Sequence, residues 1–187
     1  MNTSMKIAKA RRLPLVLLYA AVLSSLALTG NQALAAKCRP TPWDEIGPFY
    51  RPNAPVRSSI GKGYLLSGTV RSSRDCSPIS GARIEIWQTG PGGQYDETHR
   101  ATLFADRQGR YRIETVAPRG YGQRPSHIHL LVDAKGFEGL ITQHYPKQGA
   151  KKESFDLVLV PESKEGAKPG GRVDDLVRPG KLQPGKR

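Results

Sequence analysis

The chain has 187 residues, of which 20 are glycine and 15 are proline, and it carries a formal net charge of +13. A helical bundle does not tolerate so many glycines and prolines, so the composition favours short strands joined by turns. The length suits one domain with extensions and excludes a large multidomain architecture. The excess of basic residues would by itself suggest nucleic acid or an anionic surface as a partner, so the position of these charges matters.

The first 35 residues are predicted to be a secretory signal peptide. A basic start without acidic residues, residues 1–12, precedes an apolar run from Leu13 to Leu28 and the small-residue site Ala33-Leu34-Ala35. This order of segments is typical of an export signal that is cleaved near Ala35. The apolar run is shorter than the ~20 residues that a membrane span needs. We therefore expect an exported protein, periplasmic or extracellular, without a stable membrane anchor, and the pair Arg11-Arg12 leaves both the general and the twin-arginine export route open.

Cys38 and Cys76 both follow the predicted cleavage site. In an oxidising compartment a pair of cysteines forms a disulfide more often than a metal site or a catalytic site. A disulfide here would tie the N-terminal arm to the body of the domain, and two free thiols are the alternative.

Residues 36–63 form an arm rich in proline and polar residues, which we expect to wrap around the domain without regular structure. Residues 64–161 contain short β-rich segments between turn signals and no helical stripe. The predicted strands are Tyr64–Arg71, Ala82–Gln88, Arg110–Thr115, His127–Asp133, Leu140–Tyr145 and Phe155–Val160. Their even spacing predicts an all-β domain, an antiparallel β-sandwich or barrel. Residues 162–187 are interpreted as a basic, loosely ordered tail.

His127-Ile128-His129 lies in one of the predicted strands. Successive side chains of a strand point to opposite faces, so the two imidazoles share one face while Ile128, Leu130 and Val132 share the other. Two histidines at this spacing can chelate one metal ion, although two solvated polar residues on a sheet surface would show the same pattern. Zinc and copper sites also use this spacing, so the histidines alone do not select the metal.

Two tyrosines stand on glycine-rich loops. Tyr95 ends Gly90-Pro91-Gly92-Gly93-Gln94-Tyr95, and Tyr121 lies in Gly120-Tyr121-Gly122, six residues before His127. Either tyrosine alone is best explained as a packing residue. Together with the histidines, they could supply two phenolates and two neutral imidazoles, a set that suits a trivalent ion such as Fe(III). A free phenol has a pKa of about 10, so only a strongly charged metal would keep both phenolates ionised near neutral pH.

These residues resemble a known family, the intradiol ring-cleavage dioxygenases, which includes the catechol and protocatechuate dioxygenases. The resemblance runs from about Thr41 to Val160. The short spacing from Tyr121 to His127 is similar to that of the compact secreted members. The motifs that carry the resemblance are Gly47-Pro48-Phe49-Tyr50, residues 78–88, Tyr95, Tyr121-Gly122-Gln123-Arg124-Pro125-Ser126-His127-Ile128-His129 and Leu140-Ile141-Thr142-Gln143.

The resemblance implies a β-sandwich of the aromatic-dioxygenase type, related to prealbumin-like and immunoglobulin-like folds, and an enzyme that uses non-haem Fe(III). In the family, a catechol chelates the iron through both oxygens and displaces a solvent hydroxide and one tyrosine, here Tyr121, which can accept a substrate proton. O₂ then cleaves the ring between the two hydroxylated carbons and gives a cis,cis-muconate-type diacid. The implied iron ligands are Tyr95, Tyr121, His127 and His129.

Two further site residues follow from the resemblance. Arg124 would stabilise developing negative charge, and Gln143 would assist by hydrogen bonding. His99 and His144 match no ligand position and are interpreted as surface or pocket-rim residues. Residues 96–101 depart from the glycine-rich pattern of the family, which leaves the identity of the ring substrate open. The chain also lacks the long helical N-terminal region of catechol-type members, so the oligomer that this region supports is not expected.

The main alternative is a binding module without a metal. Residues 81–86 and 106–113 also resemble prealbumin-like and carboxypeptidase-regulatory β-sandwich modules. The two histidines and two tyrosines favour the enzyme, because a binding module has no need of that set. Nucleic acid is not expected as a partner, because the chain has only two Trp and four Phe, and part of its charge leaves with the signal peptide. We expect a small catecholic substrate and O₂ as partners.

Overall fold

The computed structural model describes residues 38–162. The predicted signal peptide, residues 1–35, and almost all of the predicted tail, residues 163–187, lie outside the described residues. The described part consists of strands and loops without a helix, so none of its segments is a helix able to cross a membrane. Its strands are β1 (Ser59–Ile60), β2 (Tyr64–Ser72), β3 (Arg83–Thr89), β4 (Tyr95–Phe104), β5 (Arg110–Thr115), β6 (Ile128–Asp133), β7 (Leu140–His144), β8 (Lys152–Ser154) and β9 (Leu157–Leu159).

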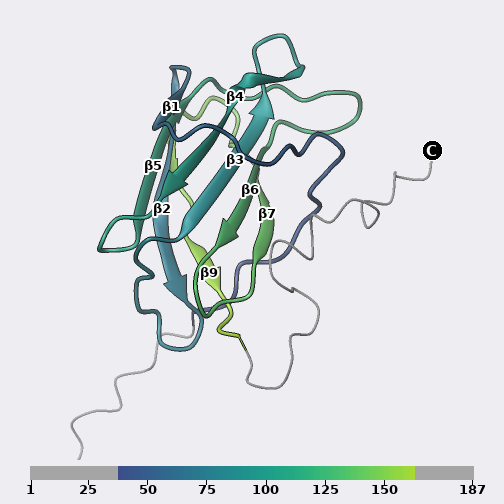
Figure 1. The fold of residues 1–187 in the computed structure, drawn as a ribbon. Helices are drawn as coiled ribbons and strands as arrows, with labels where there is room; N and C mark the ends of the chain where they lie inside the picture. The colour runs from purple at the N-terminus through teal and green to yellow at the C-terminus, as the bar shows by residue number, and fades with distance from the viewer. Residues whose placement is uncertain (1–37, 163–187) are drawn as a thin grey trace, which may run out of the picture. The chain divides into compact units, whose positions relative to one another are not determined.

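The strands form two sheets that enclose one core (Figure 1). One sheet has the order β4-β3-β6-β7 and is antiparallel throughout. The other has the order β1-β5-β2-β8, and β9 also pairs with β2. The predicted all-β sandwich is therefore confirmed. It is not antiparallel throughout, because three strand pairs are parallel: β1 with β5, β8 with β2, and β9 with β2.

The six strands predicted from the sequence are all present, with ends that differ by up to two residues. The sequence pattern does not predict β1, β4 or β8. In β4, the first half is mostly exposed and charged, so apolar residues begin to recur only at Ala101. β1 and β8 are two and three residues long, too short for any period to register.

The core lies between the two sheets. Ile84 and Ile86 of β3 are fully buried there together with Ile128, Leu130 and Val132 of β6. The alternation predicted for β6 is thus confirmed. The sheet β4-β3-β6-β7 is also covered on its outer face, where a second buried cluster consists of Trp87, Leu131 and Ile141, with Ile46, Tyr50 and Tyr95 packed against it.

The N-terminal arm crosses that outer face from one edge of the sheet to the other. The N–H of Asp44 donates to the carbonyl of Ile141 on β7 (2.9 Å), and the N–H of Thr102 on β4 donates to the carbonyl of Pro55 (2.9 Å). The arm thereby covers both edge strands, which would otherwise expose unpaired backbone groups. It wraps the domain as expected, but the expectation that it lacks regular structure is wrong at β1.

Two contacts hold the start of the arm. Cys38 and Cys76 form the predicted disulfide, with their Cα atoms 5.4 Å apart. The N–H of Thr41 donates to the carbonyl of Val158 (3.0 Å), and the N–H of Val158 donates to Oγ1 of Thr41 (2.8 Å). The arm therefore begins fixed to one sheet and then passes over the outer face of the other.

Candidate metal centre

His127 and His129 lie at the start of β6 and point away from the core. His129 is paired with Trp87 of β3 and with Gln143 of β7, so it sits in the middle of the covered outer face. Both histidines are only 1% exposed. Two imidazoles buried on one face of a strand need polar partners, which excludes the interpretation of this motif as solvated surface residues.

The protonation of the histidines suits metal binding. Nδ1 of His127 lies 2.7 Å from the carbonyl of Pro125, and because a carbonyl only accepts, Nδ1 carries the hydrogen and Nε2 keeps its lone pair. Burial lowers the pKa of His127 below its usual range, and burial, with the charges of His127 and Arg124, lowers the pKa of His129 to about 3. Both imidazoles are therefore neutral near pH 7 and able to donate a lone pair.

Tyr95 brings a phenol to the same point. A tight turn, in which the N–H of Gly90 donates to the carbonyl of Gln94 (2.9 Å), returns the chain from β3 and places Tyr95 opposite Thr89. The hydroxyl of Tyr95 lies 3.1 Å from Nε2 of His127 and 3.1 Å from Nε2 of His129, and the two Nε2 atoms are also 3.1 Å apart. Ligands at about 2.0–2.1 Å from one ion stand roughly 3 Å from one another, so this triangle fits a shared metal.

Tyr121 is the second phenol of the cluster. Its ring lies 5.6 Å from the ring of Tyr95 and 5.8 Å from that of His127. The loop before it is held to the end of β3, because Oγ1 of Thr89 donates to the carbonyl of Arg119 (2.6 Å). Burial, and then the neighbouring Tyr121, raise the pKa of Tyr95 above its usual range. A phenolate here requires a nearby positive charge, which a bound cation would supply.

The four side chains are packed on two sides by aromatic rings. Trp87 stacks on His129 with 4.8 Å between the ring centres, and Phe49 of the arm stacks on Tyr95 at 4.5 Å. Gly47 allows the arm to pass this closely, because it has a φ of +70° and a Cβ there would lie 3.1 Å from Cε1 of His129. The arm is therefore one wall of the site.

Arg124 and Gln143 lie beside the cluster and contact each other. Nη2 of Arg124 donates to Oε1 of Gln143 (2.6 Å), and Nε2 of Gln143 donates to the carbonyl of Glu45 (2.7 Å). The hydroxyl of Tyr145 lies 3.0 Å from Oε1 of Gln143 and donates to Oδ2 of Asp44, also at 3.0 Å. The structure thus brings together all six residues singled out from the sequence.

Four residues of this site are missed by sequence reasoning as site residues. Phe49 belongs to a motif of the family resemblance, which offered a signal for it, whereas Asp44, Glu45 and Tyr145 carry no local pattern. They reach the site only because the arm crosses β7, and a contact between residues about a hundred positions apart, such as Tyr145 to Asp44, has no signature in one sequence.

The interpretation as a surface or pocket-rim residue is wrong for His144, which is buried, but agrees with the partly exposed position of His99 beside the exposed Asp96. His144 is 7% exposed, and its Nε2 lies 2.7 Å from the hydroxyl of Tyr64 and 3.3 Å from Oε2 of Glu153. Its neighbour Gln143 faces the site, so alternation turns His144 into the core. The side chain of His99 is 13% exposed and bonds to Asp96 (2.8 Å). Both histidines have structural partners away from the metal cluster.

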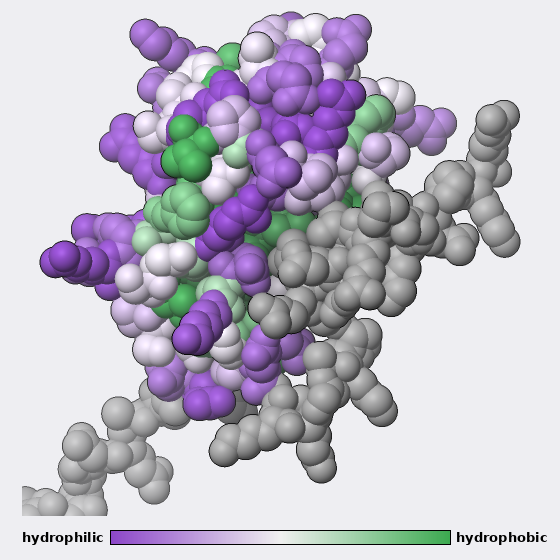
Figure 2. Space-filling model, in the orientation of Figure 1, coloured by the Kyte–Doolittle hydropathy of each residue, from purple (hydrophilic) through white to green (hydrophobic). Residues whose placement is uncertain are grey.

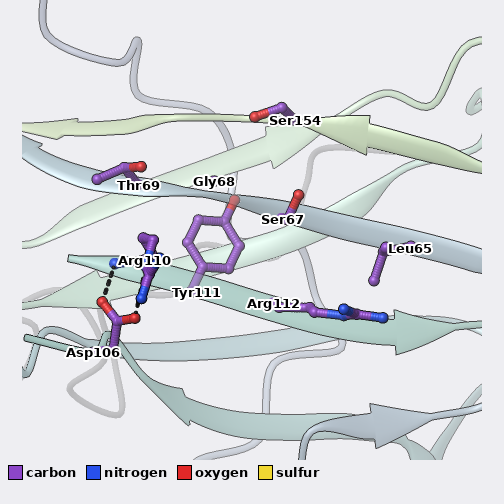
Figure 3. A pocket seen from close by; sticks show the side chains of 9 residues that line it. All are labelled: Leu65, Ser67, Gly68, Thr69, Asp106, Arg110, Tyr111, Arg112 and Ser154. Atoms are coloured by element: carbon purple, nitrogen blue, oxygen red, sulfur yellow. Dashed lines mark hydrogen bonds and ion pairs between the residues drawn. The ribbon is translucent and has the colours of Figure 1, made fainter. Parts of the chain in front are cut away.

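Of two hollows on the surface of the described residues, one lies beside the candidate site and one lies on the other sheet. A small one of about 100 Å³ borders Tyr95 and is lined by Pro48, Phe49, Tyr50, Arg51, Tyr95, Asp96, Glu97 and Arg100. A larger, shallow groove of about 500 Å³ lies on the other sheet, where Arg110 is paired with Asp106 (Figure 3). It contains none of the candidate ligands, so its size does not make it the reactive site. On the face shown in Figure 2, hydrophilic residues predominate and hydrophobic ones form small patches.

No group of three or more His, Cys, Asp or Glu side chains suited to a metal occurs in residues 38–162. The candidate centre combines two histidines with two tyrosines. Two neutral imidazoles and two phenols that can ionise match the donor set expected for a ferric ion, and the 3.1 Å triangle shows that three of the four donor atoms already converge.

A family model described as Dioxygenase matches residues 51–158, more than half of the chain. This protein belongs to the intradiol ring-cleavage dioxygenase family, whose members generally use non-haem Fe(III). The match covers both tyrosines and both histidines of the cluster. It favours the dioxygenase interpretation over the metal-free binding module.

Three relatives illustrate the similarity. Chlorocatechol 1,2-dioxygenase of Pseudomonas sp. strain P51 is 29% identical over 162 residues, 65% of this chain and 64% of that protein. Catechol 1,2-dioxygenase of Pseudomonas sp. strain EST1001 is 32% identical over 139 residues, 55% and 46% of the two chains. The dioxygenase domain of a dioxygenase carbohydrate-binding protein fusion from Streptomyces sp. SirexAA-E is 28% identical, with a TM-score of 0.60 over 66% of this chain and 100% of that domain. This chain spans between about half and two thirds of these two catechol-cleaving relatives.

Proposed function

We propose that this protein is a non-haem Fe(III) intradiol dioxygenase. It cleaves a catecholic ring between the two hydroxylated carbons with O₂ and gives a cis,cis-muconate-type diacid. The observation that supports this most directly is the convergence of the Tyr95 hydroxyl with the Nε2 atoms of His127 and His129, each pair 3.1 Å apart. The names of the relatives, catechol and chlorocatechol 1,2-dioxygenases, support the same reaction class and a catecholic substrate.

Tyr95, Tyr121, His127 and His129 would hold the ferric ion. When bound, the ion offsets the charge of the phenolates and draws electron density from a coordinated catechol, which prepares the ring for O₂. Burial keeps the two imidazoles neutral, and the carbonyl of Pro125 keeps the Nε2 lone pair of His127 directed at the cluster (2.7 Å to Nδ1). The convergence of three donor atoms supports a centre with two oxygen and two nitrogen ligands, of which Tyr121 would supply the fourth.

Other side chains would handle the substrate. Tyr121 would accept, at its phenolate oxygen, a proton from a catechol hydroxyl. Arg124, held by Gln143 at 2.6 Å, would stabilise negative charge that develops on the substrate oxygens. Phe49 and Tyr145, 41% and 44% exposed, present aromatic surface beside Tyr95 and His127, which suits a flat ring.

Colour provides the first test. Charge transfer from tyrosinate to Fe(III) should give the iron-loaded protein a burgundy colour, and O₂ uptake should accompany the addition of catechol. We expect Tyr95→Phe and His129→Ala to lose bound iron and O₂ uptake. His99→Ala is the control, because this histidine lies on the same strand as Tyr95 but bonds to Asp96. A colourless sample that contains stoichiometric iron, or O₂ uptake that persists in both ligand variants, would refute the proposed centre.

We also propose that the protein is exported to the periplasm or the extracellular space and that its signal peptide is cleaved near Ala35. The disulfide between Cys38 and Cys76 supports an oxidising compartment, where such bonds persist. N-terminal sequencing of the protein recovered from the producing cells tests this. A mature chain that begins near Ala36 is expected, and an intact Met1 in the folded protein would contradict it.

A further inference from the structure

The charges around the candidate site carry information about the substrate. Arg124 is the guanidinium next to the cluster: its backbone N–H donates to the carbonyl of Tyr121 (2.9 Å), and its Nη2 donates to Oε1 of Gln143 (2.6 Å). Its side chain is 37% exposed, so part of the guanidinium is open to solvent. In a site for catechols with a carboxylate on the ring, such a cation would be the natural partner of that carboxylate.

Arg124 is already occupied by an acid of the arm. Oε2 of Glu45 lies 3.6 Å from Nη1 of Arg124, and the Glu45 side chain is 72% exposed. The backbone of Glu45 is held firmly, because its carbonyl accepts from Nε2 of Gln143 at 2.7 Å. The Glu45 carboxylate thus lies next to the Arg124 guanidinium, and the backbone that carries it is fixed by the bond to Gln143.

A second acid stands beside the first. Asp44 accepts the Tyr145 hydroxyl at Oδ2 (3.0 Å), and its Oδ1 lies 3.4 Å from Nε2 of Gln143. Its backbone N–H is bonded to Ile141 (2.9 Å). On the β7 side of the site, two carboxylates therefore stand near one guanidinium, which only Glu45 contacts, and the formal charge of these three groups is negative.

The other side of the site offers no free cation among these contacts. Beside Tyr95, Arg51 and Arg100 both contact Oε1 of Glu97, at 2.8 and 3.4 Å. Asp96 lies next to Tyr95 in the chain and accepts from His99. On this side the two guanidiniums and the carboxylates of Glu97 and Asp96 balance in formal charge, so the excess of negative charge next to the cluster lies at Asp44 and Glu45.

We propose that the acidic pair Asp44 and Glu45 restricts the ring-cleavage site to catechols without an anionic ring substituent, with Glu45 as the specificity-determining residue. The inference rests on the proposed function. Specificity of this kind acts by repulsion of the wrong substrate and not by extra contacts to the right one. The Glu45–Arg124 contact is long and exposed, so it contributes little to the stability of the fold, and its removal leaves the structure intact.

The test compares substrates of the same shape and different charge. For the iron-loaded full-length protein, kcat/KM for O₂ uptake is measured with 4-methylcatechol and with 3,4-dihydroxybenzoate, and their ratio is the readout. The wild type should prefer 4-methylcatechol. Loss of one charge within about 10 Å of the substrate carboxylate should shift the ratio toward 3,4-dihydroxybenzoate by about 3- to 10-fold in Glu45→Gln. Any effect of the substitution on Arg124 that is common to both substrates cancels in the ratio.

Glu114→Gln is the matched control, because Glu114 is exposed on β5, in the other sheet. The ratio should be unchanged there. Wild-type protein that cleaves both substrates equally well, or a Glu45→Gln ratio equal to that of wild type, overturns the inference while the proposed function stands. Absence of O₂ uptake with catechol and with both substituted catechols overturns the proposed function and the inference together.

Discussion

Removal of the disulfide should destabilise the domain by an amount that the loop length sets. Cys38 and Cys76 are separated by 38 positions, and in the chain-entropy model the closure of such a loop removes roughly 13 cal/mol/K from the unfolded chain, about 4 kcal/mol at 25 °C. For a domain of this size each kcal/mol corresponds to about 2–4 °C, so the Tm of the double variant Cys38→Ser, Cys76→Ser should fall by about 8–16 °C. Thermal unfolding followed by circular dichroism measures this.

The same variant should also weaken the candidate metal site. The arm that starts at the disulfide continues through Asp44 to Phe49, which packs on Tyr95, so a looser arm orders the ligands less well. Wild-type protein in a reductant provides the control and should behave like the double variant. A Tm that stays within about 2 °C of the wild type would refute the reasoning, because the contacts of Thr41 with Val158 would then hold the arm alone.

Two further predictions concern single residues. Gly47→Ala should cost about 1–2 kcal/mol of stability, because its φ is +70°, and should lower iron content because the new Cβ meets His129 at 3.1 Å. Gly136→Ala, with a φ of +83° and no atom within 4 Å, should lose stability but keep iron, and equal iron contents in the two variants would contradict the steric argument. Burial lowers the pKa of His144. The unfolded chain therefore binds a proton there that the folded chain does not, so wild-type stability should fall as the pH drops below the usual histidine pKa of about 6.5. His144→Gln should show a flatter dependence of Tm on pH, and an identical slope would exclude this contribution.

The sequence predicts the ligand cluster because the relevant signals are local. The alternation in His127-Ile128-His129 decides which face each side chain takes, and it agrees with Ile128 in the core between the sheets and His129 stacked on Trp87 of the outer face. The glycine-rich segment before Tyr95 likewise marks a loop, although β4, the strand that follows it, is not predicted. Short-range patterns of period two and turn residues survive in a single sequence, so the strands and the faces that their side chains take are predictable from it.

The errors share a different physical origin. β4 is not predicted because most residues of its first half are exposed. Charged residues are favourable there, so this half shows no alternation of apolar and polar residues. His144 is misplaced because its partners, Tyr64 and Glu153, come from strands 80 and 9 positions away, and only the assembled fold shows that they solvate its ring. Periodicity reports whether a face is buried, but it does not report which polar group satisfies a buried side chain.

The residues that the sequence predicts and those that it misses would also differ in function. The four candidate ligands lie at the start of β4, in the loop before β6 and in β6, and they are predicted from their own neighbourhoods, whereas Asp44 and Glu45 approach Gln143 from almost a hundred positions away. The residues that would bind a metal therefore belong to the sheet β4-β3-β6-β7 and to the loop before β6, and the residues that would select a substrate by charge belong to the arm that crosses this sheet. Acidic side chains of the arm can be substituted without disturbing the hydrogen bonds between the strands or the core beneath the arm. In this fold, selectivity for ring substituents is then free to vary while the reactive centre stays the same, and Glu45→Gln tests that separation directly.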